Sequence, residues 1–363
     1  MIIRDLELRF FRNYRNQVFS FDPWINILIG NNAQGKTNVL EAIYLLSSSR
    51  SFKTHVNEEM VMFENSFASI KGNITSNNKP LEMQIILSKK GKKALINKNE
   101  VNRTSDYIGY FNVILFLPED LQLVQGSPRL RRRLLDTEIS KISPIYTYNL
   151  AKYQSLLKER NVYLKSLFDA HKSPDAYLEV LSEQLAHLQV DLIERRIAFT
   201  KLLDEIGHSL YKYIANDESL HITYKCHYKD ISYKSIMEKY EKTYKRDILY
   251  HTTVDGLHKD DLLITLDQKD STLFASQGQQ RSIVLAIKIA LLEIVKKEVG
   301  EYPVLLLDDV LSELDENRKM KLLNLINGKV QTFLTTTSID GIHHQLIDDA
   351  KLMVIENGVL KGE

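Results

Sequence analysis

The chain has 363 residues, of which 44% are hydrophobic and 26% charged, and its formal net charge is +1. This balance is typical of a globular protein of two or three domains and excludes a global basic field for nucleic acid. The single cysteine, Cys226, excludes an internal disulfide. The charged N-terminal segment lacks a signal-peptide pattern, and no apolar run reaches the roughly 20 residues of a membrane span. We therefore expect a cytoplasmic protein with no membrane partner.

The first third of the chain predicts short strands around one helix. Residues 2–10 and 17–21 predict two strands joined by a turn, and the apolar run 25–29 predicts a buried strand. A helix is predicted over 38–48. From about residue 60 to 117, several β-like runs separated by lysines and asparagines predict an antiparallel sheet beside this core.

The middle of the chain changes to a helical pattern. Apolar residues recur every three or four positions from Tyr146 to Leu167 and again from Leu178 to Leu210, on either side of the proline-containing segment 171–177. This spacing predicts an antiparallel helical hairpin. It fits either an ordinary two-helix domain packed on its own apolar stripe or a short lever that reaches toward a partner.

The last hundred residues return to alternating helices and strands. A long helix is predicted after residue 276, and the continuous apolar run 304–307 is typical of a parallel strand buried on both faces. A helix at 316–327 and a strand at 331–337 follow. The tail predicts a hairpin that turns at Asn357-Gly358.

A phosphate-binding motif follows the third predicted strand. It comprises Gly30, Asn31, Asn32, Ala33, Gln34, Gly35, Lys36 and Thr37. The pattern G-x-x-x-x-G-K-[ST] between a strand and a helix is typical of a phosphate loop, whose backbone N–H groups and helix dipole bind phosphate oxygens. We expect Lys36 to reach the β- and γ-phosphates of ATP, and the Thr37 hydroxyl to ligate Mg²⁺.

The second motif is an acidic strand end, where residues 304–307 lead into Asp308 and Asp309. Ligands bind at this edge of a doubly wound sheet. Asp308 is therefore expected to hold Mg²⁺, directly or through water, and Asp309 to orient or deprotonate the attacking water. ABC transporters usually carry Glu at the second position. The shorter Asp309 predicts slow hydrolysis that acts as a timer.

The third motif opens the helix before the acidic strand. It comprises Ser276, Gln277, Gly278 and Gln279. Such a helix start is a second anion-binding site, and one chain cannot easily aim both at one γ-phosphate. ABC-type ATPases solve this by head-to-tail dimerisation, in which each signature caps the ATP of the other subunit. An ordinary polar helix start is the alternative. Asp315 similarly fits either a D-loop at the dimer seam or a plain helix N-cap.

Together the motifs predict an α/β fold of the ABC-type ATPase head. Lobe I would contain mixed and antiparallel sheets, and a mostly α-helical lobe II would be inserted without a long coiled coil. We expect the N-terminal part of lobe I at 1–117, lobe II with the helical hairpin at 118–250, and the C-terminal ATPase part with signature, Walker B and D-loop at 251–363.

Stretches along the whole chain resemble the RecF family of bacterial DNA-repair ATPases, which is related to the heads of SMC proteins. They are LRFFRNYRN at 8–16, GNNAQGKTNVLEAIYLLSSSRSFK at 30–53, FLPEDLQLVQGSPRLRRRLLD at 116–136, DGLHKDDL at 255–262, ASQGQQRS at 275–282 and LLLDDVLSELDENR at 305–318.

This resemblance implies a weak DNA-dependent ATPase, with ATP and Mg²⁺ as ligands, whose hydrolysis is regulatory. It implies an ATP-dependent homodimer that binds duplex DNA and duplex–single-strand junctions, preferring linear or gapped forms. It also implies that the protein works with RecO and RecR to load RecA at single-strand gaps, with links to DNA replication and the SOS response.

The chain departs from the family pattern at three places. Leu257 and Lys259 stand where the family carries Pro and Arg, which leaves the role of the loop 255–262 open. The triplet 335–337 is Thr-Thr-Thr where a switch histidine is usual, so no γ-phosphate sensor is assigned. No Q-loop glutamine is found, and Pro-Glu-Asp at 118–120 lies where lobe I should end.

Two clusters of basic residues are candidates for DNA contact. The first lies on a predicted helix and the second on a predicted hairpin, and they comprise Arg129, Arg131, Arg132 and Arg133, and Lys89, Lys90, Lys92 and Lys93. Both could neutralise phosphates without reading sequence. The alternatives are a solvated charged surface, or arginines that pair with acids.

Three other functions compete with DNA repair. The stretch between Gly35 and Ser276 is too long for the ATPase subunit of a membrane transporter and too short for a full SMC coiled coil. A nuclease with an ABC-like head would need a separate cluster of metal-binding acids, and no domain is left to hold one. A scaffold that binds ATP without hydrolysing it stays open because of Asp309.

Overall fold

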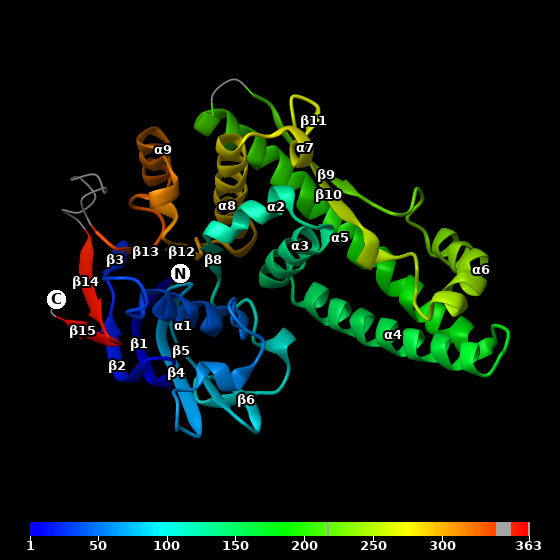
Figure 1. Cartoon of the computed structure of the whole chain (residues 1–363), viewed down its shortest axis with the longest axis horizontal. Coiled ribbons are helices and arrows are strands. Elements are labelled where there is room, and N and C mark those ends of the chain that lie inside the picture. The colour runs from blue at the N-terminus through cyan, green and yellow to red at the C-terminus, as the bar shows by residue number, and fades with distance from the viewer. Residues whose placement is uncertain (216–217, 339–349, 362–363) are drawn as a thin grey trace. The chain divides into compact units, whose positions relative to one another are not determined.

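The computed structural model describes residues 1–215, 218–338 and 350–361. The chain divides into two compact units (Figure 1). Unit 1 consists of Met1–Leu121, Tyr213–Ala215 and Arg281–Glu363, and unit 2 consists of Gln122–Lys212 and Asn216–Gln280. Residues 251–280, which we expected in the C-terminal ATPase part, thus cluster with unit 2.

Unit 1 contains two six-stranded sheets within the described residues. Its strands are β1 (Ile2–Phe11), β2 (Tyr14–Ser20), β3 (Ile25–Ile29), β4 (Phe67–Ser76), β5 (Lys79–Ser88), β6 (Gly91–Ile96), β7 (Asn99–Val101), β8 (Val113–Phe116), β12 (Val304–Asp308), β13 (Thr332–Thr336), β14 (Lys351–Glu356) and β15 (Val359–Lys361). Its helices are α1 (Lys36–Ser48), α9 (Glu316–Ile326) and all but the first turn of α8 (Gln277–Val299).

The first sheet has the order β2-β1-β4-β5-β6-β7 and is antiparallel throughout. This confirms the predicted antiparallel sheet for the runs up to residue 101, whereas the run before residue 117 forms β8, which pairs parallel with β12 in the second sheet. Two of its hairpins turn at Asn77-Asn78 and Asn97-Lys98, where both residues have positive φ. Turns of this kind match the right-handed twist of the strands. Asparagine, which accepts this conformation readily, occupies three of the four positions.

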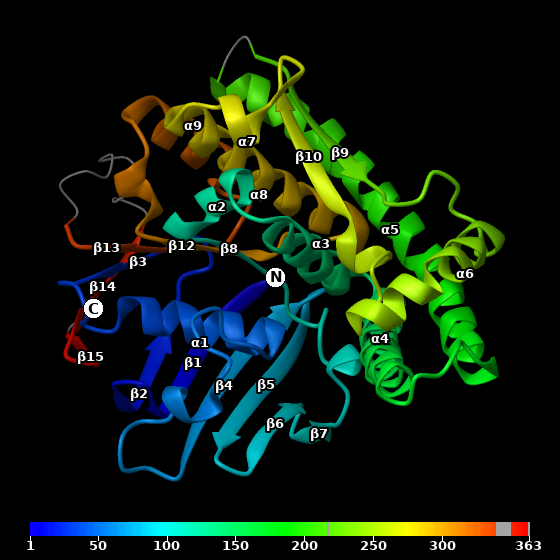
Figure 2. The ribbon, with the colours of Figure 1, turned by 45° about the vertical axis from the view of Figure 1, so that its right-hand side comes forward.

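The second sheet has the order β15-β14-β3-β13-β12-β8, and its strands are parallel except β15. The first four residues of each of β3, β12 and β13 are buried, as the apolar runs predict. Figure 2 shows α1 between the two sheets, with α8 and α9 on the other face of the second sheet. Because β3 and β12 both run parallel to β13, which lies between them, the phosphate loop and the acidic strand end emerge at the same edge of the sheet.

Unit 2 is mainly helical within the described residues, and it also contains a small sheet. Its elements are α2 (Gln122–Gln125), α3 (Pro128–Ile142), α4 (Pro144–Asp169), most of α5 (Ala176–Ala215), β9 (Leu220–Lys225), α6 (Tyr233–Tyr250), β10 (Asp261–Leu266), β11 (Lys269–Asp270) and α7 (Ser271–Phe274). No helix in the described part of the chain combines the length and the apolar character that a bilayer crossing requires.

Helices α4 and α5 form the predicted antiparallel hairpin. Near the turn, the rings of Tyr163 and Tyr177 lie 4.8 Å apart. Further along, Asn149 donates a hydrogen bond of 2.9 Å to Asp191. Earlier residues of α4 thus contact later residues of α5, which is the pattern of two antiparallel helices.

Candidate functional site

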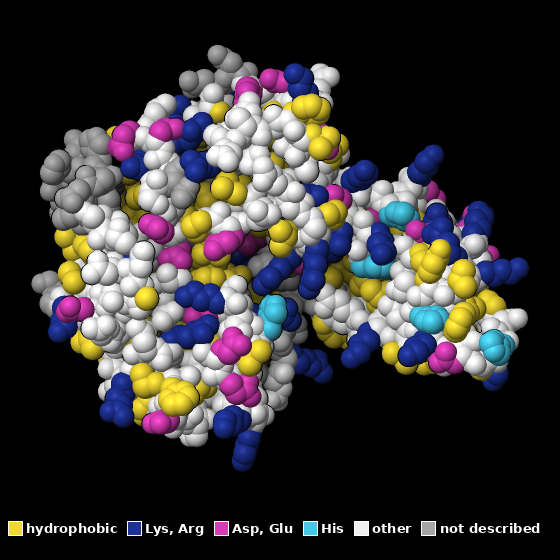
Figure 3. Space-filling model, in the orientation of Figure 1, with side chains coloured by type: hydrophobic (Ala, Val, Ile, Leu, Met, Phe, Trp, Pro, Cys, Tyr) yellow, Lys and Arg dark blue, Asp and Glu magenta, His cyan; other side chains and the backbone are white. Residues whose placement is uncertain are grey.

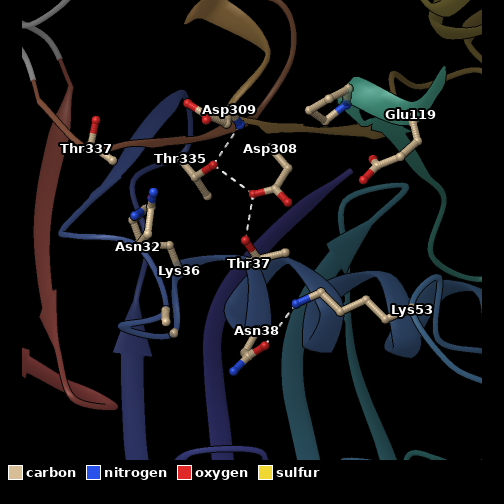
Figure 4. A pocket seen from close by; sticks show the side chains of 13 residues that line it. Asn32, Lys36, Thr37, Asn38, Lys53, Glu119, Asp308, Asp309, Thr335 and Thr337 are labelled. Atoms are coloured by element: carbon tan, nitrogen blue, oxygen red, sulfur yellow. Dashed lines mark hydrogen bonds between the residues drawn. The ribbon is translucent and has the colours of Figure 1, made fainter. Parts of the chain in front are cut away.

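A pocket of about 290 Å³ opens at the carboxyl edge of the parallel sheet in unit 1 (Figure 4). From the two predicted motifs it is lined by Asn32, Ala33, Gly35, Lys36, Thr37, Asp308 and Asp309. The structure therefore brings the phosphate loop and the acidic strand end together, as the sequence predicted. The other phosphate-loop residues, Gly30, Asn31 and Gln34, support the loop through their backbone carbonyls.

Lys36 is buried at the start of α1. Its ammonium donates hydrogen bonds of 2.5 and 2.9 Å to the carbonyls of Gly30 and Asn31. Burial lowers the pKa of Lys36, and the nearby carboxylates of Asp309 and Asp308 oppose this shift. Helix α1 has no side-chain cap and no acidic residue in its first turn. Its first N–H groups therefore need an acceptor, which a phosphate supplies.

A hydrogen-bond network joins the three elements that border the pocket. Both Thr37, from α1, and Thr335, from β13, donate to one carboxylate oxygen of Asp308, at 2.9 and 2.8 Å. Thr335 also accepts a bond of 2.8 Å from the backbone N–H of Asp309. Burial raises the pKa of Asp308, whereas the bonds from Thr335 and Thr37 lower it. The second carboxylate oxygen of Asp308 makes no bond in Figure 4.

Asp309 follows β12 in the left-handed backbone conformation, with φ of 54°. This conformation is uncommon outside glycine, although Asp tolerates it better than most residues. The change of backbone direction aims the two neighbouring carboxylates differently, as Figure 4 shows. Asp308 and Asp309 can therefore hold separate roles at one site.

Residues of the β1–β2 and β14–β15 hairpins form hydrogen bonds with the backbone of the phosphate loop. The Tyr14 hydroxyl donates to the Gly35 carbonyl at 3.1 Å, and the Asn13 side chain donates to the Gln34 carbonyl at 2.9 Å. The backbone N–H of Gly358 reaches the same Gln34 carbonyl at 3.0 Å. Gly35 has φ of 121°, and a Cβ there would lie 2.7 Å from Asn13. Only glycine fits this close approach.

Sequence reasoning missed Lys53, whose side chain enters the pocket from the loop after α1 (Figure 4). Its ammonium donates to Asn38 Oδ1 at 3.0 Å. The loop is fixed because Ser51 bonds both the buried carboxylate of Glu41 and the backbone N–H of Lys53. Burial lowers the pKa of Lys53, and Glu41 and Asp308 are the main groups that raise it.

Glu119 is a second missed residue, and Figure 4 shows its carboxylate directed toward the pocket. It lies on the short turn Pro118–Leu121 after β8, in the position where no Q-loop glutamine was found. The neighbouring Asp120 pairs with the buried Lys288 at 2.9 Å, which anchors this turn. Unit 1 thus presents a third carboxylate to the ligand.

The residues present fit Mg²⁺ together with a nucleotide. Hard cations prefer oxygen ligands, and Mg²⁺ binds through one or two protein oxygens plus phosphates and water. Thr37 Oγ1 and Asp308 Oδ1 lie 2.9 Å apart and supply such oxygens. Within the described residues no group of three or more His, Cys, Asp or Glu forms a complete metal site.

The predicted signature begins α8 and belongs to unit 2. Ser276 and Gln279 form a reciprocal cap: the Ser276 hydroxyl accepts from the Gln279 N–H at 3.2 Å, and the Ser276 N–H donates to Gln279 Oε1 at 2.7 Å. The Gln279 amide also donates to Glu218. Ser276 and Gln277 are exposed.

Asp315 is the N-cap of α9, where its carboxylate accepts from the Arg318 N–H at 2.9 Å. The Arg318 side chain forms an ion pair with the same carboxylate. Asp315 therefore forms the helix N-cap that was the alternative to a D-loop role. A half-exposed carboxylate at this position remains compatible with a D-loop.

The structure corrects the interpretation of the arginine cluster. Arg131 is buried and forms two bonds of 2.7 and 2.9 Å with the carboxylate of Asp261, so it cannot reach DNA. Arg132 is partly buried and donates to the Asp260 carbonyl at 2.7 Å. Burial lowers the pKa of Arg132. Arg129 and Arg133 are exposed and stay candidates for DNA contact.

The lysine cluster lies on β6 and on the turn that connects β5 to β6. Lys89 and Lys90 are exposed at the turn. Lys92 donates to the Ser49 carbonyl, and Lys93 pairs with Glu100 at 3.0 Å. All four lysines are exposed, but Lys92 and Lys93 already contact other groups of unit 1.

The fold and the pocket define a phosphate-loop ATPase head of the ABC and SMC type. A family model described as RecF/RecN/SMC N terminal domain matches residues 2–359. The head of an SMC protein bound to the C-winged helix domain of ScpA has a TM-score of 0.57 and 14% identity, over 99% of this chain and 96% of that chain. At that identity the similarity concerns the fold alone.

More specific similarities select one family within this class. The DNA replication and repair protein RecF of Oceanobacillus iheyensis is 44% identical over 369 residues, covering 99% of this chain and 100% of that protein. A solved structure of the recombination mediator protein RecF-ATP in the RecFOR pathway has a TM-score of 0.91 and 31% identity, over 99% of this chain and 97% of that chain. The chain belongs to the RecF family.

Proposed function

We propose that this protein is an ATP-dependent DNA-binding protein of recombinational repair and replication maintenance. The hydrogen bond between Thr37 and Asp308 carries the ATP-dependent part of this proposal, because it joins the phosphate loop and the acidic strand end beside Lys36. The similarity to RecF relatives supports the part that concerns DNA. The phosphate loop holds the triphosphate of ATP, and Thr37 and Asp308 hold Mg²⁺. The metal supplies neutralisation of phosphate charge. Asp309 orients or deprotonates the attacking water.

The second copy of the chain completes the site. The signature Ser276–Gln279 directs its helix start at the ATP of the partner copy, and Asp315 lines the seam. ATP therefore closes a homodimer around DNA. The short carboxylate of Asp309 makes hydrolysis slow. The time that hydrolysis takes therefore sets how long the dimer stays closed before it is released. DNA stimulates this hydrolysis only weakly.

The DNA substrate is a single-strand gap or a duplex–single-strand junction in the cytoplasm. The chain contains no motif for reading bases, and its accessible basic residues, such as Arg129, Arg133, Lys89 and Lys90, contact phosphates. RecR, together with RecO, is the protein partner, and RecA is loaded at the gap. The full-length match to RecF relatives supports these assignments over a transporter subunit.

Binding to gapped duplex DNA tests the proposal. Fluorescence anisotropy at one fixed salt concentration is compared with ATP, with ADP and without nucleotide. We expect tight binding only with ATP, and its loss in Lys36→Ala. Lys71→Ala is the matched control, because Lys71 lies in unit 1 and pairs with Glu82 on the first sheet. Equal, weak binding in every nucleotide state would refute an ATP-closed clamp.

The short Asp309 also favours a scaffold that binds ATP without hydrolysing it. Phosphate release in a single turnover separates the two functions. A slow but measurable rate that Asp309→Asn abolishes supports the ATPase. The absence of any turnover, with ATP-dependent DNA binding intact, supports the scaffold.

A further inference from the structure

An uncharged strip from Ser271 to Gln280 carries two large apolar side chains at the surface of unit 2. Leu273 is 74% exposed and Phe274 is 68% exposed. None of the ten residues of the strip is Asp, Glu, Lys, Arg or His. Figure 3 shows hydrophobic side chains at the surface where Figure 1 places α7. Two large apolar side chains exposed side by side on an uncharged strip are a candidate contact surface for a partner.

The short helix α7 holds these two side chains outward. The Asp270 carboxylate caps the helix by accepting from the Thr272 N–H at 2.8 Å. Ser271 is 1% exposed, so the opposite side of the turn faces the interior. The Ala275 N–H closes the turn on the Ser271 carbonyl at 3.2 Å. The exposure of the pair is therefore a property of an ordered turn.

The apolar pair adjoins the signature. Phe274 precedes Ser276 by two residues, so their Cα atoms lie within about 7 Å of each other. The Gln280 side chain donates to the Ala275 carbonyl at 2.7 Å and ties α7 to the start of α8. A surface that contacts Ser276 and Gln277 therefore lies close to Leu273 and Phe274.

We propose that Leu273 and Phe274 form the apolar part of the contact with a second copy of this chain, beside the signature that caps its ATP. This inference rests on the proposed function. Interface centres are depleted of charge and enriched in aromatic residues, as this strip is. DNA is disfavoured as the occupant, because phosphate binding requires basic groups that the strip lacks. A dry contact also strengthens the interaction of the signature with the partner's phosphates.

The test measures ATP-dependent dimerisation by sedimentation velocity across a range of protein concentrations. The variant is Leu273→Ser/Phe274→Ser. The matched control is Leu249→Ser/Tyr250→Ser, which changes a neighbouring pair at the end of α6 with 59% and 61% exposure. Fluorescent ATP-analogue binding and thermal unfolding are measured for both variants. A second variant, Leu273→Arg, keeps the turn and adds charge to the contact.

We expect the Kd of the ATP-dependent dimer to rise by about tenfold or more in the Ser pair and in Leu273→Arg. Nucleotide binding, thermal unfolding and the control pair should match the wild type. An unchanged dimer Kd in both α7 variants overturns the inference while leaving the clamp intact. A wild-type protein that stays monomeric with ATP overturns the clamp itself. Equal weakening by the α6 control would show a general surface effect and also overturns the inference.

Discussion

Unit 1 and unit 2 use buried charges for different purposes. Among the described residues of unit 1, the buried charged side chains are Lys36, Glu41 and Lys288. Lys36 faces the pocket, Glu41 anchors the loop of Lys53, and Lys288 anchors the turn of Glu119. One apolar core of this unit includes residues of both sheets and of α1. Charge in unit 1 thus positions groups that face a ligand.

In unit 2, buried charges join the elements of the unit to one another. Arg160 of α4 and Asp247 of α6 are both fully buried and pair at 2.8 Å. Arg196 of α5 pairs with Asp136 of α3 at 2.6 Å. Buried pairs of this kind contribute little net stability, and losing one partner is costly. The comparison indicates that unit 2 uses ion pairs to fix the arrangement of its helices.

The largest effect is expected from Arg160→Met in unit 2. Arg160 also donates to Ser182 at 3.1 Å and to Thr253 at 2.7 Å, so the change leaves Asp247 buried without its partner. We expect a loss of about 3–5 kcal/mol in the free energy of unfolding, measured by urea denaturation. Adding Asp247→Asn should recover most of it. Additive losses in the double variant would contradict a pair that acts as a unit.

A pH dependence should also distinguish unit 2. Burial lowers the pKa of His258 from 6.5 to about 4, a shift that the charges of Lys259 and Arg132 reinforce, while the bond to the Thr253 carbonyl and Asp255 oppose it. Between these values the unfolded chain binds a proton that the folded chain excludes. Stability therefore falls as pH decreases through this range, by at most about 3 kcal/mol for this group.

The variant His258→Gln isolates this effect. Glutamine can still donate to the Thr253 carbonyl, which His258 Nε2 reaches at 2.9 Å. We expect a shallower fall in the urea midpoint between about pH 7 and pH 5 than in the wild type. Parallel pH profiles for the two proteins would show that His258 is not the group responsible.

In unit 1, Thr335→Val should affect chemistry more than stability. The change keeps the volume in β13 and removes the hydroxyl that orients Asp308 and accepts from the Asp309 N–H. We expect about a tenfold fall in single-turnover hydrolysis, corresponding to one lost hydrogen bond to a charged group. ATP affinity and the urea midpoint should change little. A large loss of stability with normal hydrolysis would contradict the conclusion that polar groups at this site of unit 1 serve the pocket more than the fold.

The smallest effect is expected at the surface arginines of α3. Each of Arg129→Gln and Arg133→Gln should reduce the slope of log affinity for DNA against log salt by about 1 if it contacts a phosphate. Arg131→Gln should instead lower stability, because Arg131 pairs with Asp261 inside unit 2. Anisotropy titrations at three salt concentrations, together with urea denaturation, separate these outcomes. An unchanged slope for both surface variants would place the DNA elsewhere.

Much of the architecture was predictable because its signals are local. The buried strand before Gly30, the hairpin turn at Asn357-Gly358 and the α4–α5 hairpin all follow from periodicity and turn residues. Asp308 could be placed beside the phosphate loop because parallel strands present their carboxyl ends at one edge.

Other features depend on contacts between distant residues. Strands β9 and β10 pair in unit 2 but are separated by α6, so neither run indicated its partner. The four arginines of α3 look alike in sequence, and only the pairing with Asp261 separates Arg131 from the rest. Lys53 and Glu119 enter the pocket from loops whose paths local patterns do not specify.

The position of β3 in its sheet sets the order of events during synthesis. This strand precedes the phosphate loop, yet both of its neighbours, β13 and β14, come from the last part of the chain. At about 5–20 residues per second, the ribosome makes β13 roughly 15 s to 1 min after β3. All residues of unit 2 have been made by then. A nascent chain therefore cannot assemble its nucleotide pocket until translation is nearly finished, which keeps incomplete chains from binding the nucleotide there.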